Sequence, residues 1–273
     1  MSQQPPARIY KYENFTVQSL RNLKSQSLYF GSPKNFNDPY DCALNAEVSI
    51  PTDEEIKAVR AHYLRQDDLP LQGRRQLEAM NSIQLKEVVI RGARHLADQQ
   101  AEKFLSERGV TCFSEINDDL LMWSHYGGKY KGYCLEFATD YEPFQKLRKV
   151  KYVTEMPRID AAAFILREDY DQYLDLYCTK SVAWSYEKEW RAIHNVAGTS
   201  FTYPSEALLG VYFGPDIDQD CLEIVCLILA GQNEHVSFSK GVRSQQHFKV
   251  EFQSFTYTPY LDAKRQGLIS DPG

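Results

Sequence analysis

Eight consecutive residues in the second half of the chain, Trp-Ser-Tyr-Glu-Lys-Glu-Trp-Arg, combine acids, bases and aromatic rings. Two carboxylates, Glu187 and Glu189, precede the guanidinium of Arg191. If the chain is extended from Tyr186 onward, successive side chains point to opposite faces. The two carboxylates and the guanidinium then share one face, while Tyr186 and Trp190 share the other. This alternation favours a buried aromatic face behind acids that face a cleft.

A structural role for the same residues stays open. At the rim of a sheet, Arg191 would neutralise Glu189, and an exposed ion pair of this kind contributes about 0–1 kcal/mol to stability. In a site, the same carboxylates would bind a ligand or stabilise positive charge during a reaction. Two further stretches favour the second interpretation.

The first of these stretches is a loop in which Asn37 and Asp38 lie between two aromatic residues, Phe36 and Tyr40. Gly, Pro, Asn and Asp supply turn geometry and local hydrogen bonds, so a plain surface turn is the usual interpretation. The interleaved rings instead indicate a loop that folds against the body of the protein and is held there.

The second stretch contains His125 and Tyr126 directly ahead of two glycines, where the chain can turn sharply. Lys131 follows, and then a strand whose alternation places Glu136 on the face opposite Leu135. We expect all three stretches to line one pocket, because each places polar groups between aromatic rings.

Composition places the chain among soluble globular proteins. Its 273 residues are 43% apolar and 25% charged, which is ordinary for such proteins and sufficient for a substantial core. The net charge of -6 argues against a protein that coats nucleic acid by bulk charge. Aromatic residues reach 13%, including 18 Tyr, whose apolar ring and polar tip suit half-buried clefts.

The six cysteines include no Cys-x-x-Cys pair and none at a zinc-finger distance from a histidine. Free cysteines are typical of a reducing compartment. The N-terminus lacks an apolar signal core, and no apolar run approaches membrane-spanning length. We therefore expect a cytoplasmic protein with no membrane partner.

Hydrophobic periodicity predicts strands and helices without regular β–α alternation, so the expected fold class is α+β with a mixed or antiparallel sheet core. We interpret residues 1–273 as a single domain with a helical insertion at about residues 53–108, which a capping box at Thr52 and Glu55 opens. Strands are predicted at residues 9–12, 27–30, 110–113, 133–137, 150–153, 208–213 and 248–253, and further helices at 15–23, 158–182 and 218–229.

Several common catalytic motifs are absent from the sequence: Gly-x-Gly-x-x-Gly, the Walker loop, Gly-x-Ser-x-Gly and His-Glu-x-x-His. Cys134 beside His125 could act as a nucleophile, although a buried strand cysteine is the expected role. The residue spacing requires no metal, and we predict none. An alternative metal site would be built from Asp38, Asp41, Glu136 and His125.

The remaining combination of acids, rings and bases fits an anionic ligand that contains a base. Its rings can stack on Tyr or Trp, and its phosphates can bind Lys or Arg. A carboxylate can then bind a ribose hydroxyl and stabilise an oxocarbenium-like transition state. A nucleotide-like small molecule is therefore the expected partner.

Three motifs in the same order resemble the prokaryotic domain-of-unknown-function family 2971. The first is Tyr-x-Tyr followed by Leu-x-Phe-x-x-Pro-x-x-Phe-Asn-Asp-Pro, at residues 10–39. The second is Cys-Phe-Ser-Glu, Met-Trp-x-His-Tyr and Lys-Gly-x-x-Leu-x-Phe, within residues 112–137. The third is Lys-x-x-x-Trp-x-Tyr-Glu-x-Glu-Trp-Arg, at residues 180–191. This family resemblance by itself implies no activity.

A weaker resemblance links the opening strand, the short helix and the next strand to ADP-ribosyltransferase-like folds. Glu187-x-Glu189 is similar to the Glu-x-Glu pair of arginine-modifying members. The resemblance implies NAD as the substrate, Glu189 bonded to the nicotinamide ribose, a macromolecular acceptor of unknown identity, and a role as an intracellular toxin or a defence effector, for example in phage defence. The first strand departs from the pattern, because Lys11 and its neighbouring tyrosines stand where such enzymes usually carry Arg or His.

Two other classes of function stay open, namely a non-catalytic nucleotide- or nucleic-acid-binding module and a metal-dependent nuclease. For the leading hypothesis, an ADP-ribosyltransferase-like enzyme, the candidate catalytic residues are Glu187, Glu189 and His125. The candidate ligand-binding residues are Tyr12, Asn37, Asp38, Tyr126, Lys131, Glu136, Tyr186 and Arg191.

Overall fold

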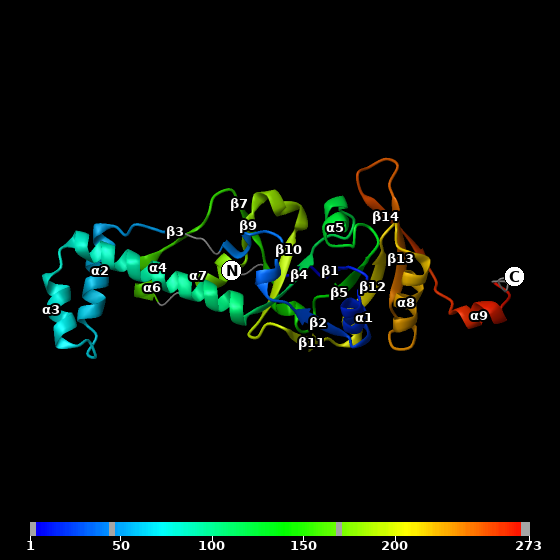
Figure 1. The fold of residues 1–273 in the computed structure, drawn as a ribbon, viewed down its shortest axis with the longest axis horizontal. Helices are drawn as coiled ribbons and strands as arrows, with labels where there is room; N and C mark the ends of the chain where they lie inside the picture. Colours follow the sequence, from blue (N-terminus) through cyan, green and yellow to red (C-terminus); the bar gives the residue numbers. More distant parts are fainter. Residues whose placement is uncertain (1–3, 44–46, 168–170, 269–273) are drawn as a thin grey trace. The chain divides into compact units, whose positions relative to one another are not determined.

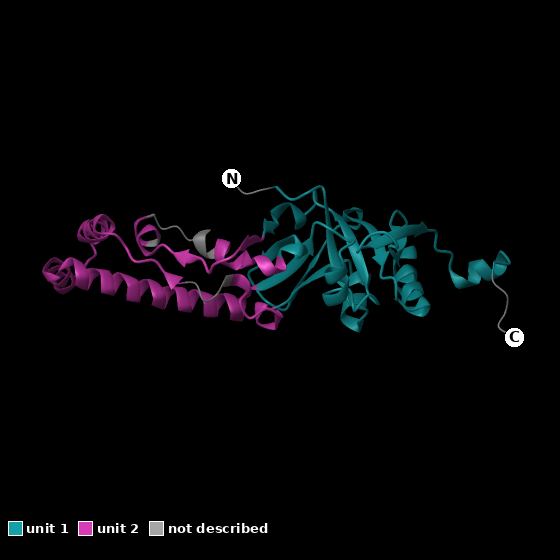
Figure 2. Cartoon of the chain, turned by 90° about the horizontal axis from the view of Figure 1, so that it is seen from above, with its two compact units in different colours: residues 1–31, 109–149, 185–273 teal, residues 32–108, 150–184 magenta. Residues whose placement is uncertain are grey.

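The computed structural model describes residues 4–43, 47–167 and 171–268, and the chain forms two compact units (Figure 1, Figure 2). The chain leaves unit 1 twice and returns to it twice. Unit 1 comprises residues 1–31, 109–149 and 185–273, and unit 2 comprises residues 32–108 and 150–184.

Unit 1 is organised around a mixed sheet, which in the described residues has the strand order β14-β13-β12-β5-β1-β4-β10-β6 (Figure 1). Neighbouring strands are antiparallel except β12 and β13, which are parallel. This sheet confirms the predicted α+β class. The strands are β1 (Arg8–Glu13), β4 (Gly109–Ser114), β5 (Tyr133–Ala138), β6 (Arg148–Lys149), β10 (Glu189–His194), β12 (Leu208–Phe213), β13 (Ser237–Arg243) and β14 (Val250–Phe255).

One face of this sheet carries the main core of unit 1. Ile9 of β1 and Phe137 of β5 pack there with Leu23 of α1 (Val17–Lys24) and Leu229 of α8 (Gln219–Ala230). The core therefore joins the sheet to the two amphipathic helices that the sequence predicts. Unit 1 also contains a two-stranded sheet of β2 (Ser27–Phe30) and β11 (Thr199–Thr202), and a last helix, α9 (Tyr260–Arg265).

The opposite face of the sheet is covered in part by α5 (Leu120–His125). Trp123 of α5 is fully buried and packs edge-on against Tyr12, with ring centroids 5.1 Å apart. Cys134 belongs to this second cluster, whereas Leu135 lies in the main core. The alternation predicted for β5 is therefore confirmed.

The backbone before Glu189 differs from the prediction. The sequence predicts an extended chain from Tyr186, but Val182–Glu187 forms the 3-10 helix η4, and β10 begins at Glu189. Lys188 between them has a φ of 44°, a left-handed conformation that redirects the chain. As a result, Tyr186 packs in the cluster of α5 while Trp190 lies in the main core, so the prediction that they share a face is wrong.

Unit 2 is mostly helical. The predicted capping box opens α2, because the hydroxyl of Thr52 accepts a hydrogen bond from the Glu55 amide at 3.2 Å and the Thr52 amide donates to the Glu55 carboxylate at 2.7 Å. Two pairs of short parallel strands complete the unit, β3 (Glu47–Val48) with β8 (Arg158–Ile159) and β7 (Lys151–Val153) with β9 (Thr179–Ser181). Its helices are α2 (Asp53–Leu64), α3 (Leu71–Ala79), α4 (Ser82–Glu107), α6 (Ala161–Arg167) and α7 (Asp171–Tyr177).

The single helix predicted over residues 158–182 is wrong, because the chain there forms β8, α6, α7 and β9. Its two ends pair with other strands of unit 2, and this tertiary pairing overrides the helical spacing of the tyrosines. Tyr170 lies outside the described residues. Tyr177 is buried and stacks on Phe104 at a centroid distance of 3.6 Å, which agrees with a core role.

Three further differences concern a predicted helix break, a strand that was not predicted, and the start of the last strand. Gly73, which the sequence treats as a break, lies inside α3. β13 is not predicted, and the last strand begins at Val250 rather than at Phe248, whose side chain is 97% exposed. None of the helices that the structure describes is long and apolar enough to cross a membrane.

Trp190→Ala tests whether the core side chain anchors β10. Trp190 is 2% exposed, and its Nε1 donates a hydrogen bond to Glu115 Oε1 at 2.8 Å. Truncation of a buried Trp lowers the free energy of unfolding by roughly 3–5 kcal/mol, and urea denaturation should show this loss. Phe248→Ala is the matched control, because truncating an exposed ring should change stability by less than about 0.5 kcal/mol. A loss at Trp190 no larger than the control's would contradict the anchoring role.

Candidate functional site

The face of the sheet opposite the main core carries tyrosines and carboxylates. Strand register pairs Glu189 with Ser114, Ser114 with Tyr10, and Tyr10 with Glu136. Cross-strand partners lie on the same face, so these four residues form one row across the sheet. Strands lie about 4.8 Å apart, which places Glu189 and Glu136 about 14 Å from each other along the row. Glu136 and Glu189 therefore lie too far apart to contact each other on this face.

Glu136 is held by two protein donors. It is 2% exposed, and it accepts hydrogen bonds from Arg8 Nη1 at 2.6 Å and from the Tyr212 hydroxyl at 2.8 Å. Burial, and then the hydrogen bond to Glu136, raise the pKa of Tyr212, so this hydroxyl stays protonated as a donor. Glycine at position 210 leaves room for the carboxylate, since a Cβ there would lie 3.2 Å from Glu136 Oε2. The two donors therefore hold this carboxylate in one orientation.

Glu189 and Arg191 form a buried ion pair with two hydrogen bonds. Arg191 Nε donates to Oε1 at 2.7 Å and Arg191 Nη2 donates to Oε2 at 2.9 Å, and the residues are 4% and 0% exposed. Glu189 and Arg191 share a face as predicted, whereas Glu187, which the prediction placed beside them in an extended chain, lies before β10 in η4. Because the guanidinium binds both carboxylate oxygens, the pair holds Glu189 as an anion and fixes its orientation.

Glu187 lies in a cluster with three other predicted site residues. The Tyr126 hydroxyl donates to Glu187 Oε1 at 2.6 Å, and Glu187 is 3% exposed. The His125 ring lies 6.4 Å from the Tyr186 ring and 6.1 Å from the Tyr126 ring, measured between centroids. Ser114 Oγ donates to the Glu187 carbonyl at 2.6 Å and so fixes η4 against β4. The end of α5 and the end of η4 therefore bring these residues together.

A cleft of about 310 Å³ opens beside this cluster, at the C-terminal end of β1. The pairing of β1 with β4, among the described residues, is limited to Tyr10 and Ser114, whereas β1 pairs with β5 along its whole length. Most of the lining side chains are neutral hydrogen-bonding groups or aromatic rings. The residues that line the cleft are Lys11, Tyr12, Glu13, Asn14, Thr16, Gln18, Ser19, Asn22, Tyr29, His125 and Tyr126.

Three of the predicted site residues line this cleft: Tyr12, His125 and Tyr126. The Tyr12 hydroxyl donates to the Ile116 carbonyl at 3.1 Å, and burial raises the pKa of Tyr12, so this group stays neutral. Lys11 supplies a cation, and its Nζ lies 3.4 Å from Glu13 Oε1. The cleft can thus offer ring faces, hydroxyls, amides and one ammonium to a ligand.

Lys131 is exposed and is not among the residues that line the cleft. It follows a turn in which Gly128, Lys129 and Tyr130 have φ values of 61°, 54° and 70°. The hydrogen bond from Arg243 lowers the pKa of Asp216, and the charge of Lys131 contributes to the same shift. The sequence prediction of Lys131 as a ligand contact therefore stays a prediction.

Asn37 and Asp38 belong to unit 2, and their convergence with His125 and Glu187 stays a prediction. Asn37 is exposed, whereas Asp38 is buried and its Oδ1 accepts a hydrogen bond from the Tyr40 amide at 2.9 Å. Asp38 Oδ2 is buried without a hydrogen-bond partner among the described residues.

The same loop contacts the first part of the third family motif within unit 2. Asp41 Oδ2 lies 3.2 Å from Lys180 Nζ, and both side chains are at most 5% exposed. Lys180 Nζ also lies 4.8 Å from the centroid of the Trp184 ring. The loop after the first motif and the start of the third motif therefore share one buried charged contact.

Cys134 is fully buried, and burial raises the pKa of its thiol well above the ordinary value, which argues against a role as a thiolate nucleophile. The described residues contain no group of three or more His, Cys, Asp or Glu side chains arranged to hold a metal ion. Within that part of the chain, Asp41 contacts Lys180 instead.

Sequence reasoning missed the amide groups of the cleft. Asn14, Gln18 and Asn22 recur every four residues, and this spacing places side chains on one helix face. Gln18 Nε2 donates to Asn22 Oδ1 at 2.8 Å within α1, whereas Asn14 precedes the helix N-cap at Thr16. That spacing was a readable signal for a polar helix face beside the first strand.

Glu189→Gln tests whether the ion pair is a structural element. Removing one charge of a buried pair costs roughly 3–5 kcal/mol, and we expect that loss of unfolding free energy in urea denaturation. Asp262→Asn is the matched control, because the exposed pair of Asp262 with Arg265 at 3.2 Å should contribute only about 0–1 kcal/mol. If the two variants lose equally little stability, Glu189 is not held by Arg191.

No curated protein and no solved structure matches the chain. Residues 122–192 match the family model described as protein of unknown function, DUF2971. The matched segment contains the cluster of His125, Tyr126 and Glu187 together with the Glu189–Arg191 pair. The match supports the family resemblance predicted from the sequence, and residues 122–192 are similar to DUF2971.

Proposed function

We propose that unit 1 binds a nucleotide-like small molecule, with NAD as the first candidate, in the cleft at the end of β1. The supporting observation is the position of Tyr126, which lines the cleft and donates a 2.6 Å hydrogen bond to Glu187. A buried carboxylate of the third family motif is thus one hydrogen bond away from a ligand in the cleft.

The lining of the cleft suits the parts of such a ligand. Rings of Tyr12, Tyr29 and His125 offer faces or edges to a base. The amides of Asn14 and Gln18 can exchange hydrogen bonds with ribose hydroxyls. Lys11 can meet a phosphate as a point charge, at the cost of its contact with Glu13.

The same arrangement supports glycosyl transfer from NAD as the proposed reaction. The bond between the ribose and nicotinamide breaks, nicotinamide leaves, and an acceptor nucleophile bonds to the ribose carbon and loses its proton. Glu187 would stabilise the positive charge that develops on the ribose, acting through its fixed position behind Tyr126. His125 is exposed at the end of α5 and can take the acceptor's proton. In this proposal Glu189 keeps the strand in place.

A binding module without turnover is the second candidate. Its support is that Glu136, Glu187 and Glu189 all engage protein donors, as anions fixed for recognition would do. A small molecule fits this candidate better than nucleic acid, because the chain has a net charge of -6. The nuclease hypothesis gains no support from the described residues.

The test is NAD binding by calorimetry and NAD cleavage by release of nicotinamide, with cell extract as the source of acceptor. We expect saturable NAD binding by the wild type. Glu187→Gln should fold and bind NAD, but its turnover should fall by roughly 10²–10³-fold, as for loss of one group that stabilises transition-state charge. Asp262→Asn, far from the cleft in sequence and exposed, is the control and should keep full turnover.

The outcomes separate the two candidates. Binding with cleavage that Glu187→Gln leaves unchanged would reject Glu187 as the catalytic carboxylate. Binding of NAD without cleavage by the wild type would favour the binding module. Absence of NAD binding would contradict the proposal for this ligand.

A further inference from the structure

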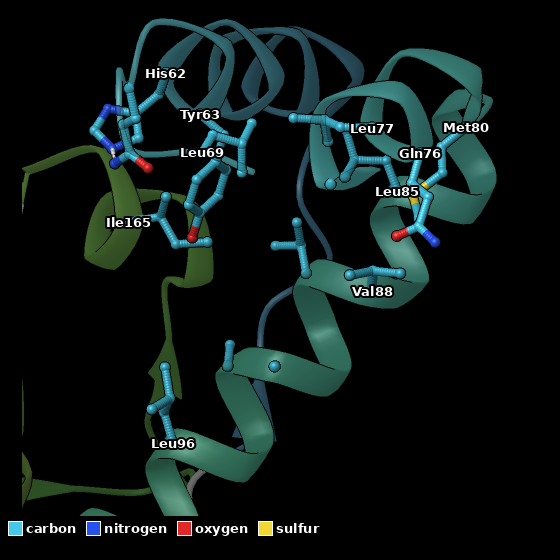
Figure 3. Close-up of a pocket in the computed structure, with 15 residues that line it drawn as sticks. His62, Tyr63, Leu69, Gln76, Leu77, Met80, Leu85, Val88, Leu96 and Ile165 are labelled. Carbon is cyan, nitrogen blue, oxygen red and sulfur yellow. Dashed lines mark hydrogen bonds between the residues drawn. The ribbon is translucent and has the colours of Figure 1, made fainter. Parts of the chain in front are cut away.

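A second cavity, of about 480 Å³, lies within unit 2 (Figure 3). Its walls come from α2, α3 and α4, with Ile165 of α6 at one side. Aliphatic side chains dominate the lining, and its described residues include no Asp, Glu, Lys or Arg. This volume lies in the range of small-molecule sites, about 300–1,000 Å³.

The floor of the cavity is an apolar stripe along α4. Leu85, Val88 and Leu96 recur at helical spacing and all contribute to the lining (Figure 3). Val88 is 46% exposed and Leu96 is 38% exposed, although both face this concave surface. Large apolar side chains in a hollow thus remain in contact with water.

Gly92 keeps the middle of the stripe open. It lies inside the 26-residue helix α4, where glycine destabilises a helix relative to alanine. A Cβ built at Gly92 would meet no atom within 4 Å, so packing does not require glycine there. Gly73 in the facing helix α3 differs, because its Cβ would lie 3.4 Å from the Leu69 side chain. Gly92 destabilises the helix, and the space above it is empty. This combination indicates a surface shaped to hold a ligand.

Tyr63 brings one polar group into this apolar space. Its hydroxyl points into the cavity toward Ile165 (Figure 3). His62 and Gln66 lie at the same end, with their Nε2 atoms 3.3 Å apart. Hydrogen-bonding groups therefore gather at this end of the apolar floor, and Gln76 adds one amide at the opposite end (Figure 3).

We infer that the unit 2 cavity binds a small, neutral amphiphilic molecule. Its apolar body lies on the α4 stripe over Gly92, and its single hydrogen-bonding group meets the Tyr63 hydroxyl. No charged side chain occurs among the described lining residues, which selects against a carboxylate or an ammonium, because burial of a charge without a partner is costly. This inference rests on unit 2 alone and does not depend on the proposed NAD site.

The experiment uses the full chain and 1-decanol as the probe, followed by methyl NMR of Leu, Val and Ile side chains. We expect saturable shifts of Val88, Leu96 and Ile165 methyls, and much weaker shifts with decanoate. Gly92→Leu should abolish saturable binding because its side chain fills the cavity. Gly231→Leu is the matched control, since a Cβ at Gly231 also meets no atom within 4 Å, and it should bind like the wild type.

Tyr63→Phe should weaken 1-decanol binding by about 2–10-fold, the loss of one hydrogen bond, while decane binding stays unchanged. Thermal unfolding of each variant shows whether it remains folded. The inference would be overturned by an absence of saturable shifts with 1-decanol, by equal shifts in Gly92→Leu, or by tighter binding of decanoate. It would also be overturned by shifts of the same methyls that depend on protein concentration without any probe. Such shifts would mean that a second copy of the chain covers the cavity.

Discussion

The buried ion pair of Glu189 and Arg191 is the constraint on which the polar face of unit 1 depends. Burying two charges is costly unless each meets the other with good geometry, and the two hydrogen bonds of 2.7 and 2.9 Å supply it. The pair lies behind Trp190, whose ring occupies the main core on the other face. β10 therefore has a fixed register and a fixed orientation. These in turn fix the position of the residues that come just before the strand.

The fixed position of β10 also determines where Glu187, the acid just before the strand, lies. Lys188, with its left-handed backbone, separates β10 from η4 and places Glu187 beside Tyr126. The two acids of the Glu-x-Glu sequence thus have different partners. Glu189 binds the guanidinium of Arg191, and Glu187 accepts a hydrogen bond from Tyr126, which lines the cleft. The Glu-x-Glu pattern by itself does not distinguish these roles.

Local alternation predicted much of unit 1 correctly. β5 and β10 place the expected side chains in the core because period-two patterns depend on a few neighbouring residues. The left-handed turn at Lys188 and the division of residues 158–182 depend instead on tertiary pairing, which no local pattern contains. The cleft escaped prediction for the same reason, since the amides of α1 become part of a site only where β1 pairs with β5 and separates from β4.

In the proposed site, the Tyr126–Glu187 hydrogen bond couples the cleft to a buried carboxylate. A double-mutant cycle of Tyr126→Phe and Glu187→Leu, with NAD affinity as the readout, measures that coupling directly, because leucine offers the Tyr126 hydroxyl no acceptor. We predict that the two changes are non-additive by at least about 1 kcal/mol, because either change removes the same interaction. Additive effects of the two changes on NAD affinity would show that this hydrogen bond does not couple the carboxylate to the bound ligand.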